Sequence, residues 1–314
     1  SKQFHNPLRC GYKQALFTWK RSLVYTAGKA SFECKEALFE IRIRQQGAER
    51  NRQAKKTNIQ TTYNMKFIGI IPARYASTRF PGKPLALLGG EYVIKHVYDV
   101  VASTLGEAYV ATDDQRIYDA VVGFGGKAVM TRADHKSGTD RIEEAVSKIG
   151  TDCDVVVNIQ GDEPFIHPSQ IKAVCDCFND PSTQIATLGK PFTDMESVEN
   201  PNSPKIVVNN SNNAMYFSRS VIPFIRGVER SQWIDWFPFL KHLGIYAYKK
   251  EVLAEITRLP QSSLEKAESL EQLRWLQNGY VIKVGTTDLE TIGIDTPDDL
   301  IRAEKVLEQL KKKE

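Results

Sequence analysis

The sequence predicts an α/β fold, in which a Rossmann-like, mostly parallel sheet is covered by helices on both faces and carries an antiparallel insertion. Two observations support this prediction. From residue 65 onward, apolar runs of strand length alternate with segments of helical periodicity, which is the rhythm of βαβ units. The runs are almost continuously apolar rather than alternating, as expected of strands that are buried on both faces.

Each predicted element follows from this rhythm. Strands are predicted at 67–72, 108–112, 127–130 and 154–160, with helices between them at 92–104, 114–123 and 138–149. Residues 184–250 show shorter strands and many Asn and Pro residues, so we expect antiparallel pairing there. Helices return at 250–258, 262–278 and 296–312. We interpret residues 65–314 as one domain with 184–250 as an insertion.

Charge is spread unevenly along the 314 residues. Residues 1–64 hold 13 Lys and Arg against 4 Asp and Glu, a net charge of +9, whereas the remainder carries −5. The first methionine is Met65, immediately before the first predicted strand. We therefore expect 1–64 to be a disordered, dispensable extension, translated from a misplaced start. A basic arm that tethers a partner, RNA or a membrane, or a transit peptide, is the alternative.

Composition also limits the partners and the compartment. The acidic body argues against general nucleic-acid binding, and no apolar run reaches transmembrane length, so we expect no membrane insertion. Five cysteines without CxxC spacing indicate structural free thiols, which are typical of a reducing cytoplasm. Scattered histidines without HxxxH spacing argue against a zinc site.

A basic loop directly follows the first predicted strand. The apolar run 67–71 stops at Pro72, and the loop then presents Arg74, Ser77, Arg79 and Lys83. Such cations, together with loop amides, suit the oxygens of a polyphosphate. The loop is not a Walker A motif, because Ser77 and Pro84 replace a required Gly and Ser or Thr. A solvated basic turn is the plainer alternative, but three cations beside a core strand favour an anionic partner.

Two carboxylates also follow strand-like runs. Asp162 comes after 154–160, and Asp295 comes after the run 291–294. Because the carboxyl ends of parallel strands share one edge of a sheet, both should face the basic loop, where they could hold Mg²⁺. The plainer interpretation is a turn or a helix-capping aspartate, and it is strong for Asp295.

For other polar segments, residue chemistry alone does not decide between a structural role and a binding role. In the loop 131–141, Ser137 or Thr139 could cap the next helix, or the loop could hydrogen-bond a base. Alternation places His242 and Tyr246 on one face of a strand, although His242 could be an ordinary core histidine. The chain contains neither GxGxxG nor GxSxG, so a dinucleotide site or a hydrolase elbow is not supported.

Taken together, these segments resemble the 3-deoxy-manno-octulosonate cytidylyltransferases, the CMP-Kdo synthetases of Gram-negative bacteria, which have the nucleotide-diphospho-sugar transferase type of fold. The matching motifs occur in order at 71–84, 130–140, 158–164, 216–219, 242–246, 270–274 and 295–297. The likeness runs from about Met65 to the C-terminus, and 1–64 have no counterpart in the family.

The resemblance implies that CMP is transferred from CTP to 3-deoxy-D-manno-octulosonate (Kdo), giving CMP-Kdo and pyrophosphate for lipopolysaccharide synthesis. It implies a homodimer in which 184–250 contributes to sugar binding and dimerisation. A cytidylyltransferase for another sugar acid, such as sialic acid, is the nearest alternative, and His242 with Glu271 and Gln272 favours Kdo. A non-catalytic nucleotide-binding protein is a further alternative, which intact Lys83, Asp162 and Asp295 disfavour.

Residue roles are implied in the same way. CTP would contact Pro72, Ala73, Arg74, Ser77, Arg79, Lys83, Arg132, Ser137 and Gly138. Catalysis would rest on Arg74, Arg79, Lys83 and Asp162, and Mg²⁺ would be held by Asp162 and Asp295. Kdo would contact Gln160, Arg219, His242, Tyr246, Glu271 and Gln272, with Arg219 as a candidate for the sugar carboxylate.

Overall fold

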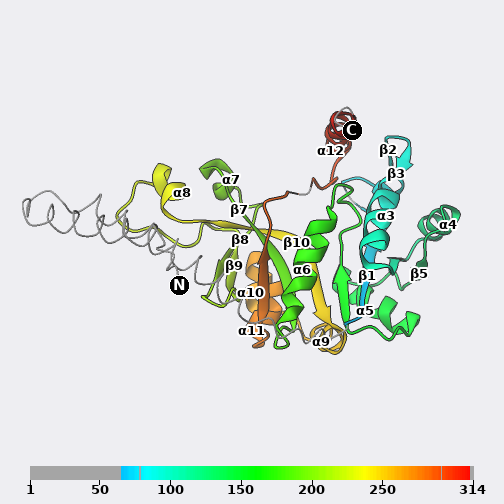
Figure 1. Cartoon of the computed structure of the whole chain (residues 1–314), viewed down its shortest axis with the longest axis horizontal. Helices are drawn as coiled ribbons and strands as arrows, with labels where there is room; N and C mark the ends of the chain where they lie inside the picture. The colour runs from blue at the N-terminus through cyan, green and yellow to red at the C-terminus, as the bar shows by residue number, and fades with distance from the viewer. Residues whose placement is uncertain (1–64, 78, 291, 312–314) are drawn as a thin grey trace, which may run out of the picture. The chain divides into compact units, whose positions relative to one another are not determined.

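The computed structural model describes residues 65–77, 79–290 and 292–311. The expectations for residues 1–64 lie outside these ranges. The described residues form a nine-stranded sheet with the order β11-β7-β10-β6-β1-β4-β5, to which β8 and β9 are added beside β10 (Figure 1). The predicted α/β class with a mostly parallel sheet is therefore confirmed.

The first half of the sheet follows the predicted βαβ pattern. Its strands β1 (Phe67–Ala73), β4 (Ala108–Thr112), β5 (Ala128–Met130) and β6 (Val155–Asn158) pair in parallel. They are connected through α3 (Val93–Leu105), α4 (Gln115–Gly123) and α5 (Gly138–Ile149). All these elements lie within one or two residues of their predicted bounds.

Helices cover both faces of this sheet. Along β1, Ile68 and Ile70 pack on one face with α5, α9 (Lys250–Ile256) and α11 (Gln272–Gln277). Ile71 and Ala73 pack on the other face with α3, α4 and α6 (Pro168–Asp176). Burial on both faces explains why the predicted strands read as continuous apolar runs.

The segment 184–250 contributes directly to the central sheet. It contains β7 (Ile185–Pro191), α7 (Met195–Glu199), β8 (Lys205–Val208), β9 (Ala214–Ser218), α8 (Trp233–Trp236) and β10 (Leu240–Lys249). Strand β10 runs antiparallel to both β6 and β7, which gives the expected antiparallel pairing. In the part of the chain between β7 and β10, Val198, Trp233 and Phe239 form a separate small hydrophobic core. Sugar binding and dimerisation by this segment stay predictions.

The C-terminal third differs from expectation in two places. The helix predicted over 262–278 is two helices, α10 (Ser263–Glu268) and α11, because Ser269 adopts a left-handed conformation with φ 51° and ends α10. A strand that was not predicted, β11 (Ile282–Thr286), pairs in parallel with β7. Residues 292–295 belong to no strand, and the Ile294 N–H donates instead to the Asp162 carbonyl over 2.8 Å.

Helix α12 (Pro297–Lys311) returns the chain to the loop that follows β1. Its Ala303 packs with Ile294, Leu88 and Val93 in a fourth apolar cluster. Figure 1 shows α12 near β2 (Leu87–Leu88) and β3 (Glu91–Tyr92). This packing fixes the segment that contains Asp295 near the basic loop. None of the described helices combines the length and hydrophobicity needed to cross a bilayer.

Candidate active site

The basic loop after β1 is closed by its own backbone. The Tyr75 carbonyl accepts hydrogen bonds from the N–H groups of Ser77 (3.0 Å) and Gly82 (2.9 Å). Gly82 is left-handed, with φ 71°, and a Cβ atom there would lie 2.9 Å from the Tyr75 ring. Glycine therefore suits this position on two counts. The short helix η1 (Lys83–Leu85) follows at once, so the tight turn fixes the start of η1 at Lys83.

A cavity of about 420 Å³ opens at the carboxyl edge of β1 and β6, and we call it the nucleotide cavity. Most of the residues predicted from sequence line it: Pro72, Ala73, Arg74, Ser77, Arg79, Lys83, Ser137, Gly138, Gln160, Asp162 and Asp295. Gly161 also lines it, and a Cβ there would lie 3.0 Å from the Pro72 carbonyl oxygen. The structure thus brings the basic loop and both carboxylates to one edge of the sheet.

The opposite charges in this cavity are in direct contact. The Lys83 ammonium forms an ion pair with Asp162, and it lies 3.2 Å from Asp295 Oδ1. An Arg79 guanidinium nitrogen lies 3.1 Å from Asp295 Oδ2. The Lys83 and Asp162 side chains are only 16% and 25% exposed, so their charges interact more strongly than they would in bulk water.

Asp295 does not cap the helix that follows it. The Thr296 and Asp299 side chains cap α12 reciprocally, since Asp299 N–H donates to Thr296 Oγ1 (3.3 Å) and Thr296 N–H to Asp299 Oδ2 (2.8 Å). The Asp295 carboxylate instead faces Lys83 and Arg79. The plainer interpretation of Asp295 as a capping residue is therefore wrong.

The two carboxylates fit a Mg²⁺ ion. Among the described residues, no three or more His, Cys, Asp and Glu side chains are grouped closely enough to enclose a metal. Mg²⁺ does not need such a cage, because it is commonly bound by one or two carboxylates and completes its shell with water and substrate phosphates. Asp162 and Asp295 both reach the same ammonium nitrogen of Lys83, so both can also reach one small cation.

Helix α5 begins at this cavity. The Ser137 hydroxyl accepts a hydrogen bond from Asp140 N–H (3.1 Å), so Ser137 rather than Thr139 is the cap. Gly138, the first residue of α5, lines the cavity. The free N–H groups at the start of α5 and the positive end of its dipole therefore lie at the same cavity as the basic loop.

Arg132 lies on the exposed side of its loop. Its guanidinium pairs with Asp134 at 3.2 Å, and its N–H donates to the Glu144 carboxylate. Glu144 also binds His135, which does line the cavity, and Lys148. Burial would raise the pKa of Glu144, but the hydrogen bonds from Lys148 and His135 lower this pKa to about 2. The loop is thereby fastened to α5, and cytosine recognition by Arg132 stays a prediction.

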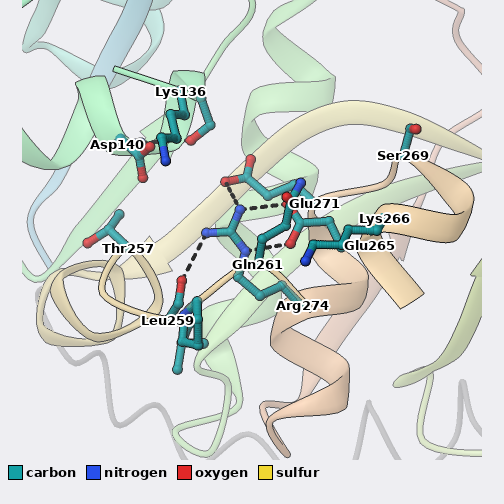
Figure 2. Close-up of a pocket in the computed structure, with 12 residues that line it drawn as sticks. Lys136, Asp140, Thr257, Leu259, Gln261, Glu265, Lys266, Ser269, Glu271 and Arg274 are labelled. Carbon is teal, nitrogen blue, oxygen red and sulfur yellow. Dashed lines mark hydrogen bonds and ion pairs between the residues drawn. The ribbon is translucent and has the colours of Figure 1, made fainter. Parts of the chain in front are cut away.

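A second cavity, of about 640 Å³, lies next to the first and shares Lys136 and Ser137 with it. Figure 2 shows this second cavity, with Glu271 among the residues around it. Gln160, the other predicted sugar residue that lines a cavity, donates to the Gly244 carbonyl (3.4 Å) and so ties the end of β6 to β10.

Three predicted sugar residues line neither cavity: Tyr246 and Gln272 are buried, and His242 is half-buried. The His242 and Tyr246 rings are 5.3 Å apart, as expected for one strand face, and burial lowers the pKa of His242 to about 3, so the ring is neutral. Among the described residues, Tyr246 OH and Gln272 Nε2 are buried without a hydrogen-bond partner. Unsatisfied buried polar atoms are uncommon in proteins, and they occur where a ligand or water completes the structure.

Arg219 lines neither cavity, although it contacts Ser269, which lines the second one. Its guanidinium donates to the backbone carbonyls of Glu268 (2.7 Å), Pro201 (2.9 Å) and Ser269 (3.3 Å). The fully buried Lys205 ammonium donates to the Arg219 carbonyl itself (2.7 Å). In this structure Arg219 therefore holds the turn between α10 and α11, and its predicted contact with a sugar carboxylate stays a prediction.

Sequence reasoning missed Arg141. This residue is 5% exposed, lines the nucleotide cavity, and donates to Asp113 Oδ2 (2.9 Å) and Thr131 Oγ1 (2.7 Å). One signal was present, because Asp113 follows the end of a buried strand and a carboxylate there needs a partner.

Comparison with known proteins identifies the class that this fold and site define. The pattern of the cytidylyltransferase family matches residues 68–291, and the chain belongs to that family. A 3-deoxy-manno-octulosonate cytidylyltransferase from Bacteroides thetaiotaomicron is 67% identical over 246 residues, which are 77% of this chain and 98% of the relative. An 8-amino-3,8-dideoxy-manno-octulosonate cytidylyltransferase from Shewanella halifaxensis is 48% identical over 236 residues, 74% of this chain and 94% of the relative.

A solved structure supports the same assignment. The CMP:2-keto-3-deoxy-manno-octonic acid synthetase complexed with CTP is 42% identical and superposes with a TM-score of 0.72, covering 78% of this chain and 99% of that one. Within the cytidylyltransferases, the chain is thus a member of the 3-deoxy-manno-octulosonate cytidylyltransferase family. The resemblance drawn from the sequence motifs is confirmed.

Proposed function

We propose that this protein transfers CMP from CTP to Kdo with the help of Mg²⁺, in the cytoplasm, as a step in lipopolysaccharide synthesis. The observation that carries the proposal is the nucleotide cavity, in which Arg79 and Lys83 contact the two carboxylates at the carboxyl edge of the sheet. The solved synthetase at 42% identity has CTP bound, which supports a triphosphate in the corresponding cavity here.

The reaction needs positioning and charge more than covalent help from the protein. The anomeric hydroxyl oxygen of Kdo attacks the phosphorus nearest the ribose and passes its proton to solvent water. The bond from this phosphorus to pyrophosphate breaks, and its electron pair leaves on the pyrophosphate oxygen. Arg74, Arg79 and Lys83 offset the negative charge that grows on the departing pyrophosphate. The walls of the two cavities hold the reactants in line, which lowers the entropic part of the barrier. No described side chain is assigned the role of general base.

Asp162 and Asp295 would hold the Mg²⁺ ion. When bound, the ion neutralises phosphate oxygens and orients them for attack. Asp162 follows β6, and Asp295 is fixed by the docking of α12, so the fold presents both carboxylates before any substrate is bound.

The sugar acid would occupy the side of the site where Gln160 and Glu271 lie. The unpartnered Tyr246 OH and Gln272 Nε2 support this placement, because a polyhydroxylated ligand offers both donors and acceptors. A neutral His242 can likewise donate through one ring nitrogen and accept through the other.

Pyrophosphate release is the direct test of substrate choice. With CTP and Mg²⁺, Kdo should support turnover, whereas ATP or GTP in place of CTP, or sialic acid in place of Kdo, should react poorly. The 8-amino sugar acid named for the Shewanella relative is the second candidate substrate, and it belongs in the same assay. Equal rates with sialic acid and Kdo would contradict the assignment.

A homodimer formed through the 184–250 segment is part of the proposal. Met215 and Phe224 in this segment are 62% and 74% exposed, and exposed large apolar side chains are typical of protein interfaces. Sedimentation should give twice the mass of one chain, and Phe224→Lys should shift the species toward the monomer. Ile301→Lys, at a 57% exposed position on α12, should leave the dimer intact. A wild-type monomer at micromolar concentration would refute the dimer.

A further inference from the structure

Glu271 lines the second cavity and is hydrogen-bonded to the helix that begins in the nucleotide cavity. Its Oε2 accepts a hydrogen bond from the Thr139 hydroxyl over 2.8 Å. Thr139 is 3% exposed and directly follows Ser137 and Gly138, which line the nucleotide cavity. This hydrogen bond joins the first turn of α5 to the turn before α11, although the two residues are 132 positions apart.

On its other side, Glu271 faces a fixed arginine. Figure 2 shows Arg274 between Glu271, Glu265 and the backbone of Leu259. A guanidinium nitrogen of Arg274 lies 3.9 Å from Glu271 Oε1. The same side chain donates to both Glu265 oxygens, at 2.7 and 2.6 Å, and to the Leu259 carbonyl at 3.3 Å.

This arrangement leaves Arg274 little freedom to move. The bidentate pair with Glu265 fixes the plane of the guanidinium. Glu265 is itself fixed, because it closes a capping box with Ser262 at the start of α10. The Arg274 and Glu265 side chains are only 11% and 7% exposed, so solvent does not compete strongly for either group. Arg274 therefore presents a charge of fixed position to Glu271.

We propose that Thr139 and Arg274 are positioning residues, which orient the Glu271 carboxylate toward the sugar acid and connect its position to the nucleotide cavity. The inference rests on the proposed function, in which Glu271 contacts the sugar. Neither residue needs to touch substrate for this role.

The charges around Glu271 give this arrangement an electrostatic signature. Burial raises the pKa of Glu271 above its ordinary value, and this effect outweighs the hydrogen bonds from Thr139 and Ser137 and the charge of Arg274, which lower it. The negative charge of Asp140 opposes the ionisation of Glu271. The exposed Lys136 lines the same cavity as Glu271. Tyr246 and Tyr248 also face the carboxylate, but burial raises their pKa values, so both remain neutral.

The sign of the expected pH effect follows. Glu271 is charged above its pKa in the folded protein and protonated below it. Removing the Thr139 hydroxyl takes away a hydrogen bond that favours the charged form, so the pKa of Glu271 should rise further. A Thr139→Val protein should then lose the Glu271 charge at a higher pH than the wild type does.

Steady-state kinetics tests the positioning role. Thr139→Val should raise the KM for Kdo about tenfold, the equivalent of one lost hydrogen bond to a charged group. The KM for CTP and kcat should change much less, because the α5 backbone and the Ser137 cap remain. Thr139→Ser keeps the hydroxyl and should behave like the wild type. Arg274→Lys keeps the charge but loses the bidentate fork, and it should raise the KM for Kdo in the same direction.

A matched control separates positioning from general damage to the α10–α11 pair. Gln277→Ala removes contacts to Ser263 (3.0 Å) and Leu264 (3.2 Å) across the same two helices without touching Glu271. Its KM for Kdo should match the wild type. In a Glu271→Gln background, adding Thr139→Val should raise the KM for Kdo little further, because the charge that Thr139 contacts is already gone.

Carbon-13 NMR of the Glu271 carboxyl in the substrate-free protein provides a readout independent of activity. The titration should move to higher pH in Thr139→Val and not in Gln277→Ala. If the wild type fails to use Kdo while the titration moves as expected, the proposed function falls and the hydrogen-bond link stands. If the wild type uses Kdo but Thr139→Val changes neither the KM for Kdo nor the titration, the positioning role is overturned. An equal rise in the KM for CTP would also overturn it.

Discussion

Replacing Lys83 with alanine should lower turnover by about 10²–10³-fold, which is the usual cost of losing one preorganised donor at a site of developing charge. Lys83 stands out among the cations of the loop because its ammonium contacts both Asp162 and Asp295 and its side chain is only 16% exposed. Arg79→Ala should act in the same direction with a smaller effect, since Arg79 is 65% exposed. The measurement is kcat from pyrophosphate release at saturating CTP and Kdo.

Lys95 on α3 offers a matched control. Like Lys83 it pairs with two carboxylates, Glu91 at 3.7 Å and Asp99 at 3.1 Å, but these contacts are on the surface. Lys95→Ala should therefore keep near-normal turnover. If Lys83→Ala is equally active, the loop is only the solvated basic turn that was the plainer interpretation of its sequence.

Changing Asp162 or Asp295 to asparagine should abolish Mg²⁺-dependent turnover, because a neutral amide is a much weaker ligand for a hard dication than a carboxylate. Each variant keeps the size of the side chain and leaves the other carboxylate beside Lys83. Turnover should be measured across a wide range of Mg²⁺ concentration, so that weakened binding is distinguished from lost chemistry. Thermal unfolding should change little, since Asp295 caps no helix.

Two neighbours of Asp295 serve as controls on α12. Asp298 is exposed in its first turn, and Asp298→Asn should keep full activity. Asp299 forms the reciprocal cap with Thr296, and Asp299→Ala should reduce the free energy of unfolding by about 1 kcal/mol. An Asp295→Asn protein that unfolds early yet turns over normally would mean that the residue has only a structural role.

Local pattern was sufficient to predict the sheet and the edge where the site lies. The run 67–72 was apolar on both faces because β1 has helices on both sides, and the loop after it is fixed by short-range hydrogen bonds such as those to the Tyr75 carbonyl. Because parallel strands end at a common edge, the convergence of Lys83 with Asp162 followed from the predicted parallel direction of the strands.

Features that depend on distant or backbone partners could not be predicted. Ser269 ends α10 in a left-handed conformation that few non-glycine residues adopt, so the helical pattern seemed to continue through it. Arg219 and Lys205 donate to backbone carbonyls, and no sequence motif marks such acceptors. Strand β11 is short and pairs with β7, a strand almost one hundred residues earlier in the chain. The short apolar run of β11 was not enough by itself to predict a strand.

The pairing of Lys83 with Asp295 has a consequence for how the protein folds during its synthesis. These residues are 212 positions apart, and Asp295 reaches its place only when α12 packs against Leu88 and Val93. During synthesis, the basic loop and most of the sheet leave the ribosome well before Asp295 does. A nascent chain can thus build its sheet before Asp295 has joined Asp162 beside Lys83. CTP with Mg²⁺ would stabilise the finished enzyme by mass action, and would give less protection to a chain whose last helix has not yet docked.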